Sequence, residues 1–214
     1  MSSSFNNTAP GFLVRNEFWL KRLHSLSGIL PIGAYVVFHF FQNSYAQHGP
    51  ERYNEVVHAL QGIPYRFILE LGVIALPILY HALYGFAILR WGAPNVRAYP
   101  YLANWRYVFQ RLTGVVALAY IVFHVYRTTM QDYLYGREVN FQLMAIDLSQ
   151  PWIFLCYAIG IVCVAYHFGN GLWSFLITWG ITRGERAQRV SSLICLGIFV
   201  SMAVWGIHIL TRFI

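Results

Sequence analysis

The sequence has few charged side chains for its length. Only 11% of its 214 residues are Asp, Glu, Lys or Arg, whereas a soluble domain carries about 25%. Hydrophobic residues make up 57%, which excludes an ordinary soluble domain and indicates a membrane protein. The length allows one compact membrane domain over residues 1–214 and leaves no room for a soluble catalytic domain.

Cysteine is also scarce. The three cysteines, Cys156, Cys163 and Cys195, form no C-x-x-C pair, which argues against iron–sulfur ligation, structural zinc and covalent haem attachment on this chain. We interpret them as small apolar fillers of membrane helices. The sequence also lacks a glycine-rich dinucleotide-binding fingerprint, which argues against a flavin site.

Five apolar stretches each reach the roughly 20 residues needed to cross a bilayer. They lie near residues 23–43, 67–90, 108–129, 151–178 and 190–211. Pro31 and Pro77 fall inside the first two stretches, and we expect each to kink its helix. The first and third linkers are long enough to hold short interfacial helices. We therefore expect an all-α membrane protein with five transmembrane helices.

The distribution of Lys and Arg predicts the orientation. With the N-terminus in the cytoplasm, the cytoplasmic segments hold ten of the fifteen basic residues and two of the eight acidic ones. The outer segments then hold five basic and six acidic residues. This places the N-terminus in the cytoplasm and the C-terminus outside. The same basic clusters would also suit an acidic partner surface or anionic lipid.

Histidine is the most informative residue type. Four of the eight histidines lie well inside the apolar stretches, one in each of the first four: His39, His81, His124 and His167. Ionisable groups are costly inside a membrane and are usually functional there. At about 1.5 Å per residue, His39 and His124 lie about 9 and 8 Å outward of their helix midpoints, whereas His81 and His167 lie about 4 Å inward.

These depths sort the four side chains into an outer pair and an inner pair. Two neutral imidazoles facing each other across a helix bundle are the ligands that six-coordinate haem iron needs. Glycines on the same helices would let a macrocycle approach the backbone, although ordinary small-residue packing explains them equally well. Proton-relay or transporter histidines and a zinc site are the alternatives to haem.

A weak internal repeat links the first and third helices. The segment Arg22–Gly28 is followed by His39, and the segment Gln110–Gly114 is followed by His124. Each segment has a basic residue, a hydroxyl and a glycine at the inner end of a helix that carries a histidine near its outer end. The repeat indicates similar roles for His39 and His124.

The sequence resembles a known family: the cytochrome b558-type, single-polypeptide membrane anchors of succinate dehydrogenases and fumarate reductases. The resemblance covers essentially the whole chain. It rests on Arg22–Gly28 with His39, Leu76–Gly85, Asn104–Gly114 with His124, and His167–Phe175 with Thr178–Thr182. Of these, the segment that begins at His167 is the most specific.

The resemblance implies a haem-binding four-helix bundle with a peripheral fifth helix. Two b-type haems would each have two histidine ligands. His81 and His167 match the ligands of the inner, proximal haem, and His39 and His124 match those of the outer, distal haem. This pairing agrees with the pairing from depth.

The resemblance also implies the function. The chain would be the quinone-reactive membrane anchor subunit of a bacterial succinate:quinone oxidoreductase, with succinate dehydrogenase preferred over fumarate reductase. It would sit in the cytoplasmic membrane and carry electrons between an iron–sulfur subunit and menaquinone. Flavin and iron–sulfur clusters would belong to the separate flavoprotein and iron–sulfur partner subunits, and no nucleic acid is expected as a partner.

Two further residue sets follow from position and resemblance. Haem propionates need polar and cationic partners, and the candidates at the cytoplasmic end are His24, Ser25, Tyr107 and Arg111. Quinone reduction needs proton donors, and the candidates at the outer end are His58, Arg66 and Glu70, with Asn54 and Gln61 nearby. We expect Arg66 and Glu70 to pair at i, i+4.

One position departs from the family pattern. Some dihaem fumarate reductases carry a glutamate two residues before the histidine equivalent to His167, where this sequence has Ala165. A transmembrane proton route through that carboxylate is therefore in doubt. Two rival functions are a dihaem cytochrome b of another respiratory complex, which lacks the segment from His167 to Phe175, and a haem-free transporter or anchor.

Overall fold

The computed structural model of the protein describes residues 11 and 15–214; the rest of the predicted domain, residues 1–10 and 12–14, lies outside the described part. The fold is 84% helical, with no strand among the described residues. Five helical segments are long and apolar enough to cross a membrane, which confirms the predicted fold class. They are Glu17–His48, Arg66–Trp91, Leu102–Tyr135, Pro151–Thr178 and Glu185–Phe213.

The two predicted helix interruptions both appear. The first span consists of α2 (Glu17–Ile29) and α3 (Pro31–Asn43), which begins at Pro31. The second contains α5 (Arg66–Leu69), a π-helical turn at Glu70–Ala75, and α6 (Leu76–Trp91), with Pro77 in its first turn. Proline lacks the backbone N–H that a continuous helix needs, so each helix restarts where the proline occupies a first-turn position.

The fourth span is one long helix, the third and fifth each consist of a long helix continued by a shorter one, and short helices fill the linkers as expected. Asn140 caps the last linker helix, because its side-chain oxygen accepts a hydrogen bond of 2.8 Å from the backbone N–H of Leu143. The remaining helices are α4 (Pro50–Gln61), α7 (Leu102–Arg127), α8 (Thr129–Tyr135), α9 (Phe141–Leu148), α10 (Pro151–Thr178) and α11 (Glu185–Leu210).

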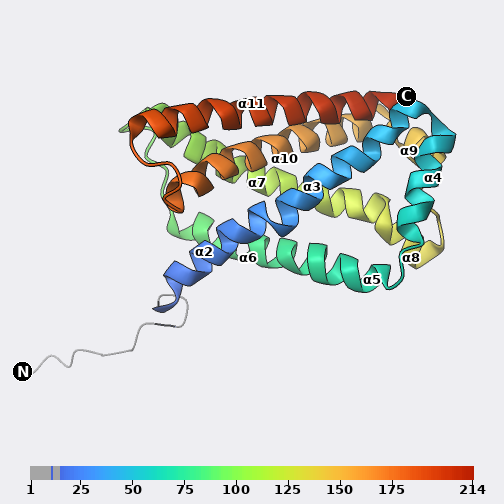
Figure 1. Ribbon diagram of the computed structural model, residues 1–214, viewed down its shortest axis with the longest axis horizontal. Helices are drawn as coiled ribbons and strands as arrows, with labels where there is room; N and C mark the ends of the chain where they lie inside the picture. The colour runs from blue at the N-terminus through green and yellow to red at the C-terminus, as the bar shows by residue number, and fades with distance from the viewer. Residues whose placement is uncertain (1–10, 12–14) are drawn as a thin grey trace, which may run out of the picture.

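Figure 1 shows the five spans running roughly side by side, with two distinct ends. The start of α2, the last turns of α6 and α10 and the first turns of α7 and α11 form one end, here named the α2 end. The helices α4, α8 and α9 and the C-terminus form the other, here named the α4 end. The sequence predicts that the α2 end faces the cytoplasm.

Helix α10 lies at the centre of the packing, against both α7 and α11. Small residues let α10 and α11 approach closely, since a Cβ added at Gly169 would lie 2.9 Å from the carbonyl oxygen of Cys195. Ala165, the residue that departs from the family pattern, is fully buried in this core. By contrast, Leu83 on α6 and Val204 on α11 expose more than 60% of their area, as lipid-facing side chains do.

Candidate functional site

The four intramembrane histidines meet in two pairs, at two levels of the bundle. The rings of His81 on α6 and His167 on α10 have centres 6.1 Å apart and planes at 85°. The rings of His39 on α3 and His124 on α7 have centres 5.6 Å apart and planes at 75°. Each ring thus lies beside the partner that the depth argument predicts; their ligand role stays a prediction.

The spacing of these rings fits a metal ion held between two imidazoles. An imidazole nitrogen lies about 2 Å from its metal, so two rings on opposite sides of one ion have centres roughly 6 Å apart. Among the described residues, no group of three or more His, Cys, Asp or Glu side chains is arranged so that it could hold a metal ion. A structural zinc ion takes four protein ligands, so the pairs suit haem iron, whose other ligands come from the porphyrin.

The ring of His81 is held by α2. Its Nδ1 lies 3.0 Å from the carbonyl oxygen of His24 and 3.3 Å from the hydroxyl of Ser27. A carbonyl only accepts, so this contact places the proton on Nδ1 and leaves the Nε2 lone pair free for a metal. A Cβ added at Gly28 would lie 2.6 Å from His81 Cε1. The ring therefore packs directly on the backbone of α2.

The ring of His167 is held by α7 in the same way. Its Nδ1 lies 2.9 Å from the carbonyl oxygen of Gln110, and a Cβ added at Gly114 would lie 2.8 Å from its Cε1. The Gln110 side chain donates to the carbonyl of His167 at 3.0 Å and accepts from Asn170 at 2.7 Å. Gln110 and Asn170 thus fix the segment of α10 that carries the ring.

These contacts give the internal repeat a structural meaning. In both copies a carbonyl oxygen and a glycine four residues later receive one imidazole of the His81/His167 pair: His24 with Gly28, and Gln110 with Gly114. The membrane span that receives an inner ring also carries a histidine of the other pair near its far end. Sequence reasoning connected the repeat only with His39 and His124 and missed this role.

The repeat also extends beyond the segments recognised in the sequence. Tyr35 lies four residues before His39, and Tyr120 lies four residues before His124. The Tyr35 and His39 ring centres are 5.5 Å apart at 28°, and those of Tyr120 and His124 are 5.8 Å apart at 31°. The tyrosine spacing was a usable signal that sequence reasoning missed.

Side chains rather than backbone contact the His39/His124 pair. The hydroxyl of Tyr157 lies 3.2 Å from Nδ1 of His124. The amide nitrogen of Asn43 lies 3.4 Å from both ring nitrogens of His39, so it favours neither tautomer. These polar contacts are longer than the carbonyl contacts of the other pair.

The other glycines on these helices pack against protein. A Cβ at Gly33 would collide with the ring of Phe168, and Gly85 faces His24 at 3.4 Å. Gly171 faces the side chain of Gln110 at 3.2 Å. Of the glycines considered for a macrocycle, Gly28 and Gly114 are the ones that adjoin the candidate ligand rings.

Among the propionate candidates, His24 and Ser25 lie on α2. The His24 ring stacks on that of His81, with centres 4.0 Å apart and planes at 16°. Its Nδ1 is buried and has no hydrogen-bond partner among the described residues. The hydroxyl of Ser25 accepts a 3.0 Å hydrogen bond from Trp179 Nε1 and donates to the carbonyl of Arg22.

The other two candidates, Tyr107 and Arg111, lie together on α7. The Arg111 guanidinium carbon lies 3.6 Å from the centre of the Tyr107 ring, and the side chain donates to the carbonyl of Ile88 on α6 at 3.2 Å. One guanidinium nitrogen of Arg111 is buried without a partner in the described part of the chain. Within the described part of the chain, no hydrogen bond or ring contact joins Arg111 or Tyr107 to His24 or Ser25, so the four candidates form two separate groups at the α2 end.

The predicted Arg66–Glu70 pair is present, at 3.3 Å, and belongs to a larger network. Arg66 also pairs with Asp132 at 2.7 Å, and the Tyr133 hydroxyl donates to Glu70 at 2.9 Å. Sequence reasoning missed Asp132 and Tyr133, which α8 brings to the start of the second span. His58 is exposed on α4, and among the described residues no hydrogen bond or ion pair joins it to this network.

Asn54 and Gln61, the other polar residues of that linker, hold the loop around α9. Asn54 accepts a 2.8 Å hydrogen bond from the backbone of Phe141 and donates to Gln142 at 3.2 Å. Gln61 donates to the carbonyl of Val139 at 3.4 Å. These contacts give both side chains a structural role at the α4 end.

Comparison with known proteins identifies the family of the chain. The model of the family "Succinate dehydrogenase/Fumarate reductase transmembrane subunit" matches residues 93–207. The succinate dehydrogenase cytochrome b558 subunit of Bacillus subtilis (strain 168) is 40% identical over 198 residues, which cover 92% of this chain and 98% of that protein. The match thus extends over nearly the whole of both chains. This five-span protein belongs to the succinate dehydrogenase/fumarate reductase transmembrane subunit family.

Proposed function

We propose that the chain is a dihaem cytochrome b that anchors a bacterial succinate:quinone oxidoreductase and carries electrons between its iron–sulfur subunit and menaquinone. The observation that carries this proposal is the presence of two imidazole pairs with ring centres 6.1 and 5.6 Å apart on four different helices. The name cytochrome b558 of the similar protein from Bacillus subtilis also supports haem.

The four histidines would be the axial ligands, in the pairs His81 with His167 and His39 with His124. When bound, the two haems supply reversible one-electron chemistry. The protein supplies ligand identity and orientation. The carbonyls of His24 and Gln110 hold two Nδ1–H groups, which fixes the tautomer that presents Nε2 and makes these imidazoles stronger donors to iron.

The quinone site would lie at the α4 end, beside the His39/His124 pair. The network of Arg66, Glu70, Asp132 and Tyr133 places carboxylates, a phenol and a guanidinium at the start of the second span. A quinone gains two protons when it is fully reduced, so its carbonyls need adjacent proton donors. Glu70 and Tyr133 are suited to relay protons there, and His58 on α4 would exchange them with solvent.

The α2 end would face the cytoplasm and receive the flavoprotein and iron–sulfur subunits. Basic side chains gather there, including Arg90 in the last turn of α6, Arg97 in the following loop, and Arg183 and Arg186 around the start of α11. This distribution is the one that the positive-inside rule associates with the cytoplasmic side. Electrons would therefore enter on the side of the His81/His167 pair.

The proposal is tested by purifying the complex from the membrane, identifying its subunits and measuring haem per chain. We expect co-purified flavoprotein and iron–sulfur subunits and a pyridine haemochrome value near two per chain. Both haems should be low-spin and reducible by succinate. A value near one, or a high-spin visible spectrum, would contradict the bis-histidine assignment of both pairs.

A further inference from the structure

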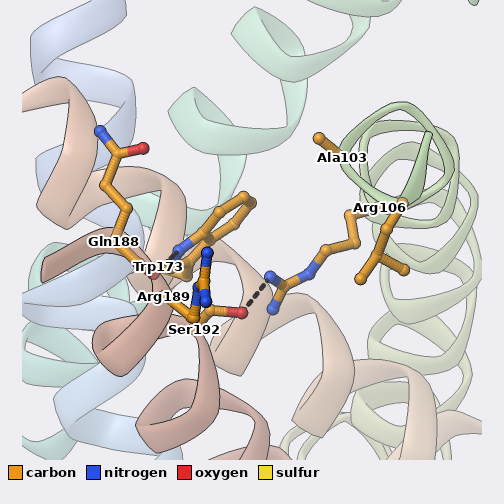
Figure 2. A pocket seen from close by; sticks show the side chains of 7 residues that line it. Ala103, Arg106, Trp173, Gln188, Arg189 and Ser192 are labelled. Carbon is orange, nitrogen blue, oxygen red and sulfur yellow. Dashed lines mark hydrogen bonds between the residues drawn. The ribbon is translucent and has the colours of Figure 1, made fainter. Parts of the chain in front are cut away.

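A hollow of about 260 Å³ opens at the α2 end, between the first turns of α7 and α11 and over α10. Figure 2 shows Arg106 of α7 reaching toward Ser192 of α11, with Arg189 and Trp173 beside them. The hollow is separate from the histidine pairs and from the Arg66–Glu70 network, because none of their residues lines it.

The hollow holds two arginines without a carboxylate partner. All eight Asp and Glu residues of the chain lie in the described part, and none of them forms an ion pair with Arg106 or Arg189. Arg106 donates a hydrogen bond to the hydroxyl of Ser192, at 2.7 Å, and its side chain also interacts with the hydroxyl of Tyr166. A guanidinium has five N–H donors, so Arg106 keeps N–H groups that an anion can use.

The Arg106 guanidinium is held in place before any ligand binds. Its central carbon lies 4.0 Å from the centre of the Trp173 ring, a cation–π contact that fixes the plane of the group. The Trp173 indole is fixed in turn, because its N–H donates to the carbonyl of Gln188 at 3.2 Å. Preorganised arginine forks bind phosphate oxygens with little loss of side-chain entropy.

The apolar surroundings of the hollow favour the phosphate of a lipid over free phosphate as the ligand. The adjoining turns expose apolar side chains: Leu102 of α7 is 74% exposed, and Leu193 and Ile194 of α11 are 65% and 59% exposed. The hollow is open to the surface, so a phosphate head group can enter it while the acyl chains stay outside, against these residues. Basic hollows between helices at a membrane boundary bind anionic lipid head groups.

We propose that Arg106, Arg189 and Ser192 form a binding site for the phosphodiester of an anionic phospholipid, whose acyl chains lie along the exposed apolar faces of α7 and α11. The proposal needs only the membrane position of the chain. It is independent of the haem ligands and of the quinone site.

The test compares complexes purified in mild detergent and placed in nanodiscs of phosphatidylcholine that contain phosphatidylglycerol as the anionic lipid. Bound phosphatidylglycerol is measured by native mass spectrometry for the wild type, R106Q, R189Q and the double variant. The control is R97Q, which removes one positive charge from the loop between α6 and α7, outside the hollow. Haem content and helical circular dichroism show whether each variant is folded.

We expect retained phosphatidylglycerol to fall roughly fivefold for each of the two arginines and to stay unchanged in R97Q. Arg189 is exposed, so R189Q tests the proposal even if R106Q disturbs folding. Equal retention by the double variant and the wild type would overturn the proposal. So would displacement of the lipid by millimolar inorganic phosphate, which indicates a soluble anion site. If the variants lose the partner subunits but retain the lipid, the arginines serve subunit docking instead. That result would also overturn the proposal.

Discussion

The two histidine pairs differ in what holds their rings. In the His81/His167 pair, each Nδ1 contacts a backbone carbonyl of a neighbouring helix at 3.0 or 2.9 Å, and each ring packs on a glycine. In the His39/His124 pair the nearest polar contacts come from side chains, at 3.2 Å or more. One pair is set by the backbone geometry of α2 and α7, the other by side chains near the α4 end.

The two kinds of contact differ in how easily a substitution removes them. A carbonyl acceptor persists whatever side chain occupies its residue, so the tautomer of His81 and His167 tolerates most nearby substitutions. The glycines beneath those rings are the exception, because any side chain there displaces the ring. A phenol or amide contact is lost by a single substitution, so the surroundings of His39 and His124 are easier to tune.

The largest expected effect comes from removing a ligand of the backbone-held pair. H81A or H167A should lower haem from two to one per chain, because the remaining imidazole cannot provide bis-histidine ligation. Succinate–quinone activity should vanish, whereas succinate oxidation by an artificial acceptor should survive on the partner subunits. Pyridine haemochrome and both activity assays measure this. Full quinone activity in H81A would show that electrons do not enter through this pair.

Substitution of Gly28 or Gly114 tests how the His81/His167 pair is held without changing a candidate ligand. G28A places a methyl carbon 2.6 Å from His81 Cε1, and G114A places one 2.8 Å from His167 Cε1, so each should displace a ring by a few tenths of an ångström or more. We expect loss or a shifted spectrum of one haem, with the other unchanged. The control is G197A, since nothing lies within 4 Å of a Cβ at Gly197. Normal spectra in both variants would contradict the packing of the His81 and His167 rings on these glycines.

Much of the fold could be predicted from the sequence. Long apolar runs identify spans, because a bilayer requires about 20 such residues in each. Helix rise places the four histidines at two depths without knowledge of packing. The Arg66–Glu70 pair follows from helical spacing alone. These features depend only on local periodicity, which is why they needed no tertiary information.

The partners of the histidines could not be predicted in this way. Gln110 contacts His167 across 57 positions of sequence, and Tyr157 contacts His124 across 33. Such contacts depend on how each helix is rotated about its axis, and helices that are apolar all round carry little information about rotation. The same limit explains why Asp132 and Tyr133 were missed.

A third prediction concerns the proposed quinone site at the side-chain-held pair. E70Q removes a carboxylate that pairs with Arg66 and accepts from Tyr133, and should lower quinone reduction by at least about tenfold if this group relays protons. Both haems should remain and still be reduced by succinate. H58A should also lower turnover, but less, because His58 is exposed and outside the network.

The matched control for E70Q is D132N, which also removes a carboxylate from Arg66, at 2.7 Å. If Glu70 has a specific role, D132N should keep most of the quinone turnover. Equal losses in both variants would mean that the network acts structurally. Normal turnover and inhibitor sensitivity in E70Q and H58A would place the quinone elsewhere.

The smallest effect, and the sharpest test of the comparison, is expected from Y157F. The variant keeps the aromatic ring and removes only the hydroxyl, 3.2 Å from Nδ1 of His124. Loss of such a supporting contact typically weakens metal binding by about tenfold or more, so the haem at this pair should dissociate more readily in detergent and change its reduction potential. Haem content after detergent extraction measures the dissociation. Redox titration followed at the two haem bands measures the reduction potentials. The haem held by His81 and His167 should keep its potential, because its supporting acceptors are backbone carbonyls far from this residue. If Y157F shifts both haems equally, or neither, then the contrast between backbone-held and side-chain-held ligands has no functional consequence.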